Sequence, residues 1–320
     1  MHFLRAVVLN ATFLTSTALA AEFPGWAYPP CPAAAASGNS ETAAQALSVA
    51  GSGIHFTRTE LRDRTSAPDW FPREHGPLPP VVAGNHLPNK LACGFCHLPD
   101  GNGRPENAKL AGLSPSYIIA QVKAFHALER RSAQPDWLPA TLMVNSTAEL
   151  TEAELAAAAD YFSQQQVRSF VHVVESDRVP EHTAACYIFK PAHKGRVSLG
   201  SAIVEMPIDI ERFERRDPHT TYVAYVPQGS IERGRQLART GAHDRTQPCA
   251  LCHGPDLRGG PQLPGPPLAG RFASYLFRQL YGFQSGARGG EVAQPMRAVV
   301  ARLTQKDMID LAAYAASLDP

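Results

Sequence analysis

Two identical arrangements of cysteine and histidine are the residues in this sequence most able to do chemistry. Cys-x-x-Cys-His occurs as Cys93–His97 and again as Cys249–His253. In such a pentapeptide the two thiols can add to the vinyl groups of a haem, and the adjacent histidine can bind its iron. Each copy therefore predicts one covalent c-type haem. We expect two haems, attached through Cys93, Cys96, Cys249 and Cys252, with His97 and His253 as ligands of the irons.

The same four cysteines could instead form a zinc site, in which two Cys-x-x-Cys pairs share one metal ion. That alternative gives no role to the histidine that directly follows the second cysteine in both copies. The haem interpretation accounts for all the positions that recur, so we favour it.

The two motifs belong to a longer internal repeat. They are 156 residues apart, Leu-Ala-Gly recurs at 110–112 and 268–270, and the end of each half matches at an offset of 153. Self-similarity at a nearly fixed spacing indicates a duplicated module. Further matched pairs are Tyr117 and Tyr275, Gln121 and Gln279, Phe125 and Phe283, Arg130 and Arg288, Met143 and Met296, Leu150 and Leu303, and Tyr161 and Tyr314.

Each repeat has the start signals of short helices. Ser114 and Pro115 precede a run with one apolar face, which predicts a helix over 117–128 with Ser114 as its N-cap. Thr151 and Thr304 are each followed three residues later by a carboxylate, which predicts a capping box before the last helix of each module. A haem would give such short helices a large apolar surface to pack around.

A second axial ligand for each iron must come from elsewhere in the module. Met143 and Met296 occupy matched places, 46 residues after His97 and 43 after His253, and we expect both in loops before the last helix. A thioether sulfur is a neutral ligand that raises the reduction potential. The alternative is that both methionines are packing residues. His126 has no histidine counterpart in the second half and is expected on the surface.

With these features the sequence resembles the tandem class I cytochromes c, a family of exported dihaem electron carriers. The resemblance covers about residues 85–167 and 229–320 and rests on the haem motifs, the Leu-Ala-Gly to Arg stretch and the methionine positions. It implies a mainly α fold of two cytochrome c modules. It also implies that His97 and His253 are proximal ligands, Met143 and Met296 distal ones, and that the two haems exchange electrons.

The N-terminal region contains two kinds of segment. Residues 1–20 combine Arg5, a short apolar run and small residues, which predicts an export signal cleaved near Ala20 and a periplasmic or otherwise exported protein. Residues 21–84 are expected to form an irregular wrap around the first module. Within them, 33–53 is small and polar, and we expect a mobile lead-in there.

Residues 168–228 separate the two modules and have a different character. Alternating or β-branched patterns predict short strands in this insertion. The fold class is therefore mainly α, with two cytochrome c modules (85–167 and 229–320) and a small β-containing insertion. The predicted strands are 170–174, 186–189, 196–210 and 221–226.

Charge and cysteine count limit the partners. The chain has 30 Lys and Arg against 29 Asp and Glu, so its charge gives no reason to expect nucleic acid. After the leader, no stretch of eighteen apolar residues predicts a membrane span. Cys31 and Cys186 are left over from the haem motifs. In an oxidising compartment a disulfide between them is one of two open outcomes, the other being free thiols.

Two classes of function fit these observations. The first is an electron-transferring cytochrome, either a carrier or a subunit of a dehydrogenase. Its partners would be redox proteins, with a dehydrogenase as donor and an oxidase or another cytochrome as acceptor. The second is a dihaem enzyme, a peroxidase or a sulfur-compound oxidoreductase, with one open haem iron. The matched methionines favour the first class, because they would fill both irons. Whether the chain is itself an enzyme stays open at this point.

Overall fold

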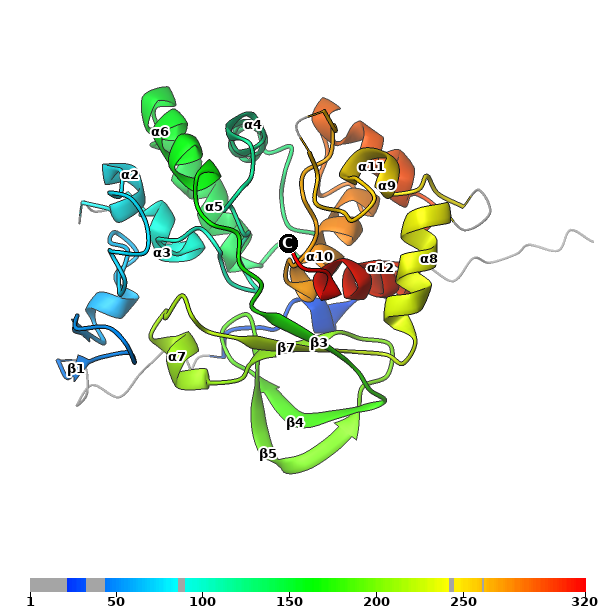
Figure 1. Ribbon diagram of the computed structural model, residues 1–320, viewed down its shortest axis with the longest axis horizontal. Coiled ribbons are helices and arrows are strands. Elements are labelled where there is room, and N and C mark those ends of the chain that lie inside the picture. Colours follow the sequence, from blue (N-terminus) through cyan, green and yellow to red (C-terminus); the bar gives the residue numbers. More distant parts are fainter. Residues whose placement is uncertain (1–21, 33–43, 86–89, 242–244, 261) are drawn as a thin grey trace, which may run out of the picture.

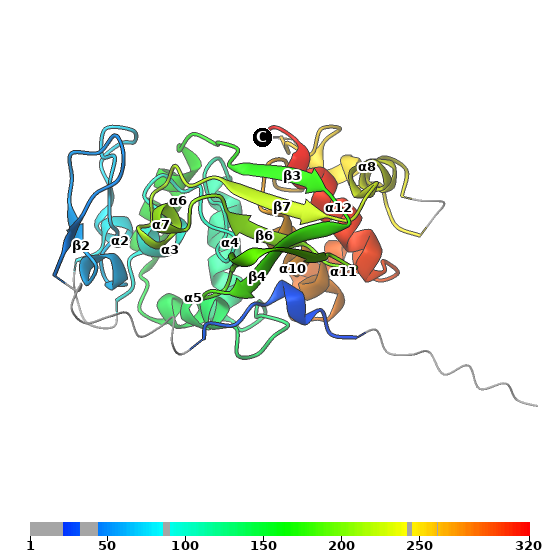
Figure 2. The ribbon, with the colours of Figure 1, turned by 90° about the horizontal axis from the view of Figure 1, so that it is seen from below.

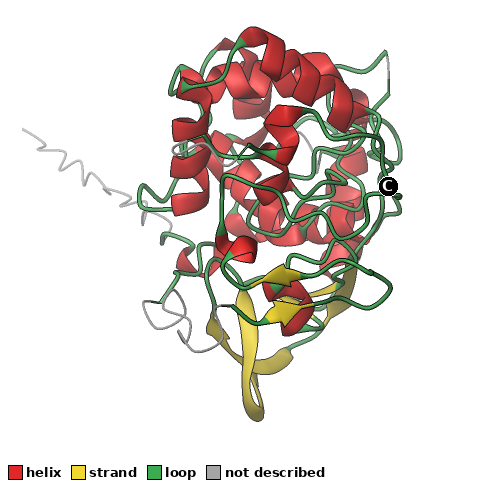
Figure 3. Cartoon of the chain, turned by 90° about the vertical axis from the view of Figure 1, so that its left-hand side faces the viewer, coloured by secondary structure: helices red, strands yellow, loops and turns green. Residues whose placement is uncertain are grey.

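Two groups of helices lie side by side, and strands gather along one side of both (Figures 1 and 3). The computed structural model describes residues 22–32, 44–85, 90–241, 245–260 and 262–320. The predicted export signal lies outside the described residues. We call the helices α2 to α6 module 1 and the helices α8 to α12 module 2. This arrangement confirms the predicted fold class.

Module 1 is built from five helices, and the haem motif forms the second of them. The signals at Ser114 and Thr151 are confirmed: Ser114 Oγ accepts from the Tyr117 amide, and Thr151 forms a capping box with Glu154. The helices are α2 (Pro80–Ala83), α3 (Cys93–His97), α4 (Pro115–His126), α5 (Leu138–Ala148) and α6 (Glu152–Ser163).

Module 2 repeats this order with a longer first helix. It has eleven residues in α8 where α2 has four, and α8 packs across the last helix. Gly234 permits the crossing, because a Cβ there would lie 1.9 Å from the carbonyl oxygen of Asp310. The capping box at Thr304 is confirmed. The helices are α8 (Ser230–Thr240), α9 (Ala250–His253), α10 (Ala273–Gln284), α11 (Gln294–Val300) and α12 (Gln305–Ser317), with a 3-10 turn, η4 (Glu291–Ala293), before α11.

The insertion forms two small sheets, which lie below the helices in Figure 1 and in front of them in Figure 2. In the first sheet β7 (Tyr222–Val226) lies between β3 (Val171–Glu175), to which it is parallel, and β6 (Val204–Pro207), to which it is antiparallel. The second is an antiparallel hairpin of β4 (Arg178–Ala184) and β5 (Phe189–Ser198). Val171, Tyr222, Ala224 and Val226 are buried in the same core as module 2, so the insertion packs as a layer on that module.

The predicted strands of the insertion are correct in part. Those at 170–174 and 221–226 correspond to β3 and β7. The prediction at 186–189 was wrong, because residues 186–188 form the bend between β4 and β5. The run 196–210 is not one strand but the end of β5, then β6, and then the start of the helix α7 (Ile210–Glu214). Asp209 begins α7 by accepting hydrogen bonds from the Glu211 and Arg212 amides.

The N-terminal segment is more ordered than a mobile lead-in. β1 (Ala46–Leu47) pairs with β2 (Phe56–Thr57), and Leu47 and Val49 are buried against Trp70. The expectation for 33–53 was therefore wrong for its second half, while 33–43 lie outside the described residues. Cys31 and Cys186 form a disulfide that fastens the segment to the insertion. Two 3-10 turns, η1 (Gly25–Ala27) and η3 (Glu60–Arg62), complete the segment.

Candidate haem-binding sites

The first haem motif forms a single helical turn in module 1. Cys93, Cys96 and His97 all lie on α3, whose Phe95 and His97 are buried. The imidazole of His97 is oriented by the backbone, because its Nδ1 lies 2.8 Å from the carbonyl oxygen of Ala108. When Nδ1–H donates to a carbonyl, Nε2 carries the lone pair that can bind a metal.

The second motif repeats this geometry in module 2. Cys249 precedes α9, which carries Cys252 and His253, and His253 Nδ1 lies 2.7 Å from the carbonyl oxygen of Pro266. Gly265 leaves room for the ring, because a Cβ at this residue would lie 2.5 Å from His253 Nδ1. The two histidines therefore have equivalent orientations although the flanking loops differ in sequence.

The burial of both motifs suits a haem. Burial lowers the pKa of His97 and of His253, so both imidazoles stay neutral, which is the form that binds iron. Burial also raises the pKa of Cys93 to about 12 and that of Cys249 to about 11. A thioether-linked cysteine carries no charge, so Cys93 and Cys249 can be buried in that form without burying a charge. The donor set fits two thioether-linked haems better than a zinc ion.

The zinc alternative also fails on geometry. In the described part of the chain, no three His, Cys, Asp or Glu side chains gather where they could hold a metal ion. The two Cys-x-x-Cys pairs lie in different modules (Figure 1). They therefore do not share a metal ion.

The matched methionines lie on helices rather than in the loops that we expected. Met143 is in α5 and Met296 in α11, each the helix before the last of its module. Met296 packs against the module 2 core, and Ser146 Oγ lies 4.0 Å from the sulfur of Met143. Met308 is fully buried in the module 2 core. Axial ligation by Met143 and Met296 stays a prediction.

The remaining candidate ligands are accounted for. Met206 is buried in the insertion among Val179, Leu199 and Val204, away from both haem motifs. His126 is exposed at the end of α4, as expected for a surface histidine. Neither residue competes with the matched methionines for a role at iron.

The repeated polar residues meet at the boundary between the modules. Arg130 donates to Gln121 at 2.8 Å within module 1 and to Gln279 at 3.0 Å in module 2. Arg288 donates to Gln279 at 3.0 Å and reaches back to Gln121 at 2.7 Å. The two arginine backbones form an antiparallel bridge. The sequence repeat marked these residues but not their contact, so the modules face each other across a local twofold axis.

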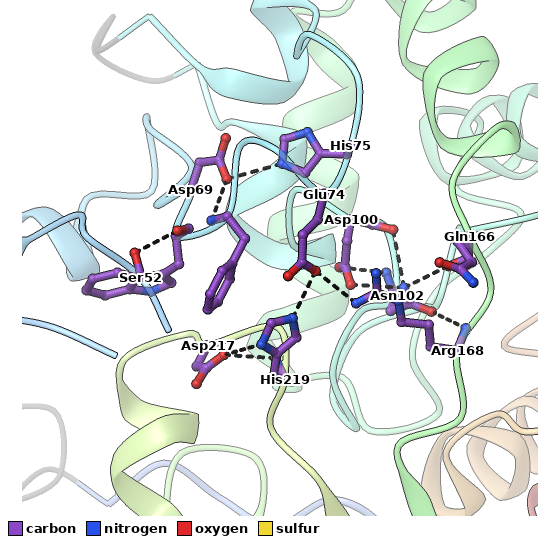
Figure 4. Close-up of polar contacts among 12 residues, drawn as sticks. Ser52, Asp69, Glu74, His75, Asp100, Asn102, Gln166, Arg168, Asp217 and His219 are labelled. Atoms are coloured by element: carbon purple, nitrogen blue, oxygen red, sulfur yellow. Dashed lines mark hydrogen bonds and ion pairs between the residues drawn. The ribbon is translucent and has the colours of Figure 1, made fainter. Parts of the chain in front are cut away.

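A polar network joins the insertion and the N-terminal segment to module 1 (Figure 4). Glu74 accepts from His219 Nε2 at 2.9 Å and from Arg168 at 3.0 Å. Asn102, five residues after His97, donates to the Gln166 carbonyl and accepts from the Arg168 amide. Burial opposes ionisation of Glu74, but the hydrogen bonds from His219 and Arg168 together lower its pKa. The network therefore holds three segments together beside the first haem motif.

Sequence reasoning missed the residues of the insertion that reach module 1. Arg216 follows α7 and donates to the carbonyl oxygen of Phe95, between the two cysteines of the first haem motif. Arg104 lies over the ring of Phe213. No spacing pattern joins residues so far apart. The only available signal was the run of charged residues at 209–217, which we interpreted as part of a β-containing segment.

Several known cytochromes are similar to this chain in sequence. Residues 81–166 and 231–319 each match the cytochrome c family. Cytochrome c4 of Azotobacter vinelandii is 26% identical over 226 residues, which cover 69% of this chain and 82% of that protein. The thiosulfate dehydrogenase electron acceptor of Stutzerimonas stutzeri is 40% identical over 73 residues, covering 23% of this chain and 32% of that protein. The structure of reduced cytochrome c4 from Pseudomonas stutzeri is similar with a TM-score of 0.45, 25% identity, and coverage of 71% of this chain and 93% of that chain.

The fold and the two sites define a c-type cytochrome with two haem modules. The chain belongs to the cytochrome c family. It carries two covalently bound c-type haems and transfers electrons, and the alternative of a dihaem enzyme is not favoured. Among the described residues, no helix combines the length and apolar character needed to cross a membrane.

Proposed function

We propose that this dihaem cytochrome is an exported carrier that works in the periplasm, with His97 and Met143 on one iron and His253 and Met296 on the other. The proposal rests on one observation above all. Both modules hold the histidine with its Nδ1 fixed by a carbonyl, and each has a repeat-matched methionine on the helix before its last. Such an arrangement gives each iron two protein ligands and leaves no open position for a substrate.

The ligands are tested by replacing one methionine at a time in the holoprotein. Met143→Ala and Met296→Ala should keep both haems attached, because attachment uses only the cysteines. Each variant should lose the charge-transfer absorption band of one methionine-ligated ferric haem, turn that haem high spin, and bind carbon monoxide at it. Met206→Ala is the control and should change none of these. A full-strength band in either single variant would show that the replaced methionine is not a ligand.

The donor is proposed to be a periplasmic dehydrogenase, and one that oxidises a sulfur compound is favoured. The support is the likeness of one part of the chain to the thiosulfate dehydrogenase electron acceptor of Stutzerimonas stutzeri. A carrier with two saturated irons would accept one electron per haem from such an enzyme and pass each to an oxidase or another cytochrome.

Mixing experiments test this donor. Oxidised cytochrome is combined with catalytic amounts of a thiosulfate dehydrogenase and with thiosulfate, and reduction of both haems is followed by absorbance. We expect full reduction only when enzyme and substrate are both present. Reduction by thiosulfate without the dehydrogenase, or turnover of peroxide by the cytochrome alone, would instead support the enzyme alternative. No reduction in the complete mixture would exclude this class of donor while leaving the ligand assignment intact.

A further inference from the structure

The two haem motifs are covered to very different extents. In module 1, Phe95 between the cysteines is 4% exposed, and Cys96 packs near Ala67 and Ala92. At the matched position of module 2, Leu251 is 63% exposed, and Cys252 is also exposed. The repeat therefore places two equivalent haem motifs in unequal surroundings, and part of the cover over the first motif, at Ala67, comes from outside the module.

Arg216 of the insertion is the central part of this cover. Its guanidinium lies 3.5 Å from the centre of the Phe95 ring, and its Nη1 donates to the Phe95 carbonyl oxygen at 2.7 Å. Its Nε donates to the Leu61 carbonyl oxygen at 3.1 Å. The residue has φ of 56°, a left-handed conformation that a non-glycine side chain rarely adopts. The insertion and the segment around Leu61 thus hold a cation against α3. In Figure 1, α7, which precedes Arg216, lies on the same side of the molecule as α3 and below it.

The charge next to the first haem motif is not balanced. The charged side chains that act on Arg216 include Arg104 and Arg64 as cations and Glu106 as an anion. Glu106 is already paired with Arg104 at 3.0 Å, with both side chains 7% exposed. Arg216 takes part in no salt bridge within the described part of the chain, since its donors go to carbonyl oxygens. Glu106 is therefore engaged by Arg104, and no salt bridge among the described residues offsets the charge of Arg216.

We propose that the positive charge of Arg216, which the insertion holds against the first haem motif, raises the reduction potential of the haem in module 1. Reduction of a ferric haem removes one positive charge, so a fixed cation in a poorly solvated place stabilises the ferrous form. Module 2 has an open motif in place of this cover. The insertion would thereby give two haems with the same attachment motif different reduction potentials. The inference rests on the two covalent haems, not on the identity of the partners.

The test is a spectroelectrochemical titration of the holoprotein, fitted with two potentials. Each potential is assigned to its haem from hyperfine-shifted haem methyl resonances, with contacts to Phe95 marking module 1. Arg216→Gln should lower the ferrous-to-ferric ratio of that haem on the order of tenfold at a given potential, which is about 59 mV for a one-electron couple. The haem of module 2 should be unaffected. Arg216→Lys keeps the charge, so the potential of the module 1 haem in this variant should be close to that of the unchanged protein.

A control and a second variant separate this effect from structural damage. Arg215→Gln makes the same chemical change one residue earlier, where the side chain donates to Ser48 and pairs with Glu211, and it should leave both potentials unchanged. Glu106→Gln removes the opposing anion and should raise the potential of the same haem. If Arg216→Gln leaves that potential unchanged, or if Arg216→Lys lowers it as much as Arg216→Gln, the proposal is wrong. If Arg216→Gln does not fold, Glu106→Gln decides, and a lowered or unchanged potential overturns the proposal.

Neither series of variants depends on the other. Replacing a methionine ligand changes the absorption spectrum, whereas Arg216→Gln should keep the wild-type spectrum and alter only the potential. A wrong ligand assignment and a wrong role for Arg216 would therefore be recognised separately.

Discussion

At the scale of single residues, the orientation of His97 and His253, the proposed proximal ligands, depends on atoms that carry no charge. The carbonyl oxygens of Ala108 and Pro266 each accept from an Nδ1–H, which fixes the ring and leaves Nε2 for iron. In module 2 the absence of a side chain at Gly265 is equally necessary, since it gives the imidazole its space.

This predicts the effect of a single methyl group. In Gly265→Ala the new Cβ would lie 2.5 Å from His253 Nδ1, so either the ring or the loop must move. We expect weaker iron ligation by His253 and a lowered potential of the second haem, with the first haem unchanged. Gly260→Ala is the matched control, because its Cβ would make ordinary contacts, the nearest at 3.4 Å. Resonance Raman spectra of the two variants measure the ligation, and an unaltered spectrum for Gly265→Ala would contradict the prediction.

His75 gives the N-terminal segment a dependence on pH. The hydrogen bond to Asp69 at 3.1 Å raises the pKa of this imidazole, although burial acts against it. A raised pKa in the folded state means that the stabilisation is complete below the unfolded value of about 6.5 and is lost as pH rises through the folded value. Hydrogen-exchange protection of residues 46–76 should therefore fall between pH 6 and pH 8.5.

The variant His75→Gln should lose this dependence, with lower protection at pH 6 and little further change at pH 8.5. His172→Gln replaces an exposed histidine of the insertion and should behave like the unchanged protein. Equal pH dependence in His75→Gln and the unchanged protein would show that another group is responsible.

The residues that do the chemistry could be predicted because they are close in sequence. A capping box acts within four residues, and the boxes predicted at Thr151 and Thr304 are confirmed. Cys-x-x-Cys-His spans one helical turn, which made His97 and His253 easy to single out, and their ligation of iron stays a prediction. The cysteine pair Cys31 and Cys186 was one of two outcomes left after the haem motifs were assigned. Arg216 could not be found in this way, because its contact with Phe95 spans 121 residues and depends on how the insertion folds.

At the scale of elements, the start of α10 shows how the insertion supports module 2. Its N-cap residue, Phe272, has no side chain that can accept a hydrogen bond. The carboxylate of Glu205 on β6 is the acceptor instead. It accepts from the amides of Ala273 and Ser274 at 3.0 and 3.1 Å and from the Ser274 hydroxyl. A strand thus supplies the cap that the local sequence lacks, which is why helix signals alone did not mark the start of α10.

Removing this carboxylate should therefore destabilise module 2. Glu205→Ala leaves two buried amides without an acceptor, which we expect to cost about 1–3 kcal/mol in the free energy of unfolding. Glu205→Gln retains one acceptor oxygen and should cost less. Glu211→Ala, at an exposed carboxylate of the same insertion, is the control. Guanidinium denaturation of the holoprotein measures all three, and equal stability of Glu205→Ala and Glu211→Ala would contradict the capping role.

The elements that were predicted wrongly or missed are those whose secondary structure depends on tertiary contacts rather than on local sequence. Both matched methionines lie in helices, α5 and α11, where we expected loops; each helix has proline at one of its first two positions, where helices tolerate it. The strand β4 was missed because Pro180, Glu181 and His182 break the alternating pattern, although the hairpin tolerates them with an irregular register. The first helices of the modules differ in length, four residues against eleven, a difference that the repeat did not reveal.

At the scale of the whole molecule, the boundary between the modules is held by arginine and glutamine. Arg130 and Gln279 should be energetically linked, because their hydrogen bond crosses the boundary between the modules. Arg130 is buried and Gln279 is half-buried, so water competes little for this bond. A double-mutant cycle with Arg130→Ala and Gln279→Ala should give an interaction free energy of about 0.5–3 kcal/mol. The exposed pair Arg235 and Glu232 is the reference and should give no measurable interaction. Additive effects of the two alanine substitutions would contradict the prediction.

The crossed contacts of Arg130 and Arg288 have the form of a symmetric dimer interface, in which residue i meets j and j meets i. Two separate subunits would need a sizeable apolar surface to associate through such a patch. In this chain a continuous polypeptide keeps the halves at a high effective concentration, so a few hydrogen bonds are enough to set their orientation. The same covalent connection frees the halves from having to remain identical. The haem motif of one half can be enclosed while that of the other half is exposed. Two identical subunits of a homodimer cannot differ in sequence in this way.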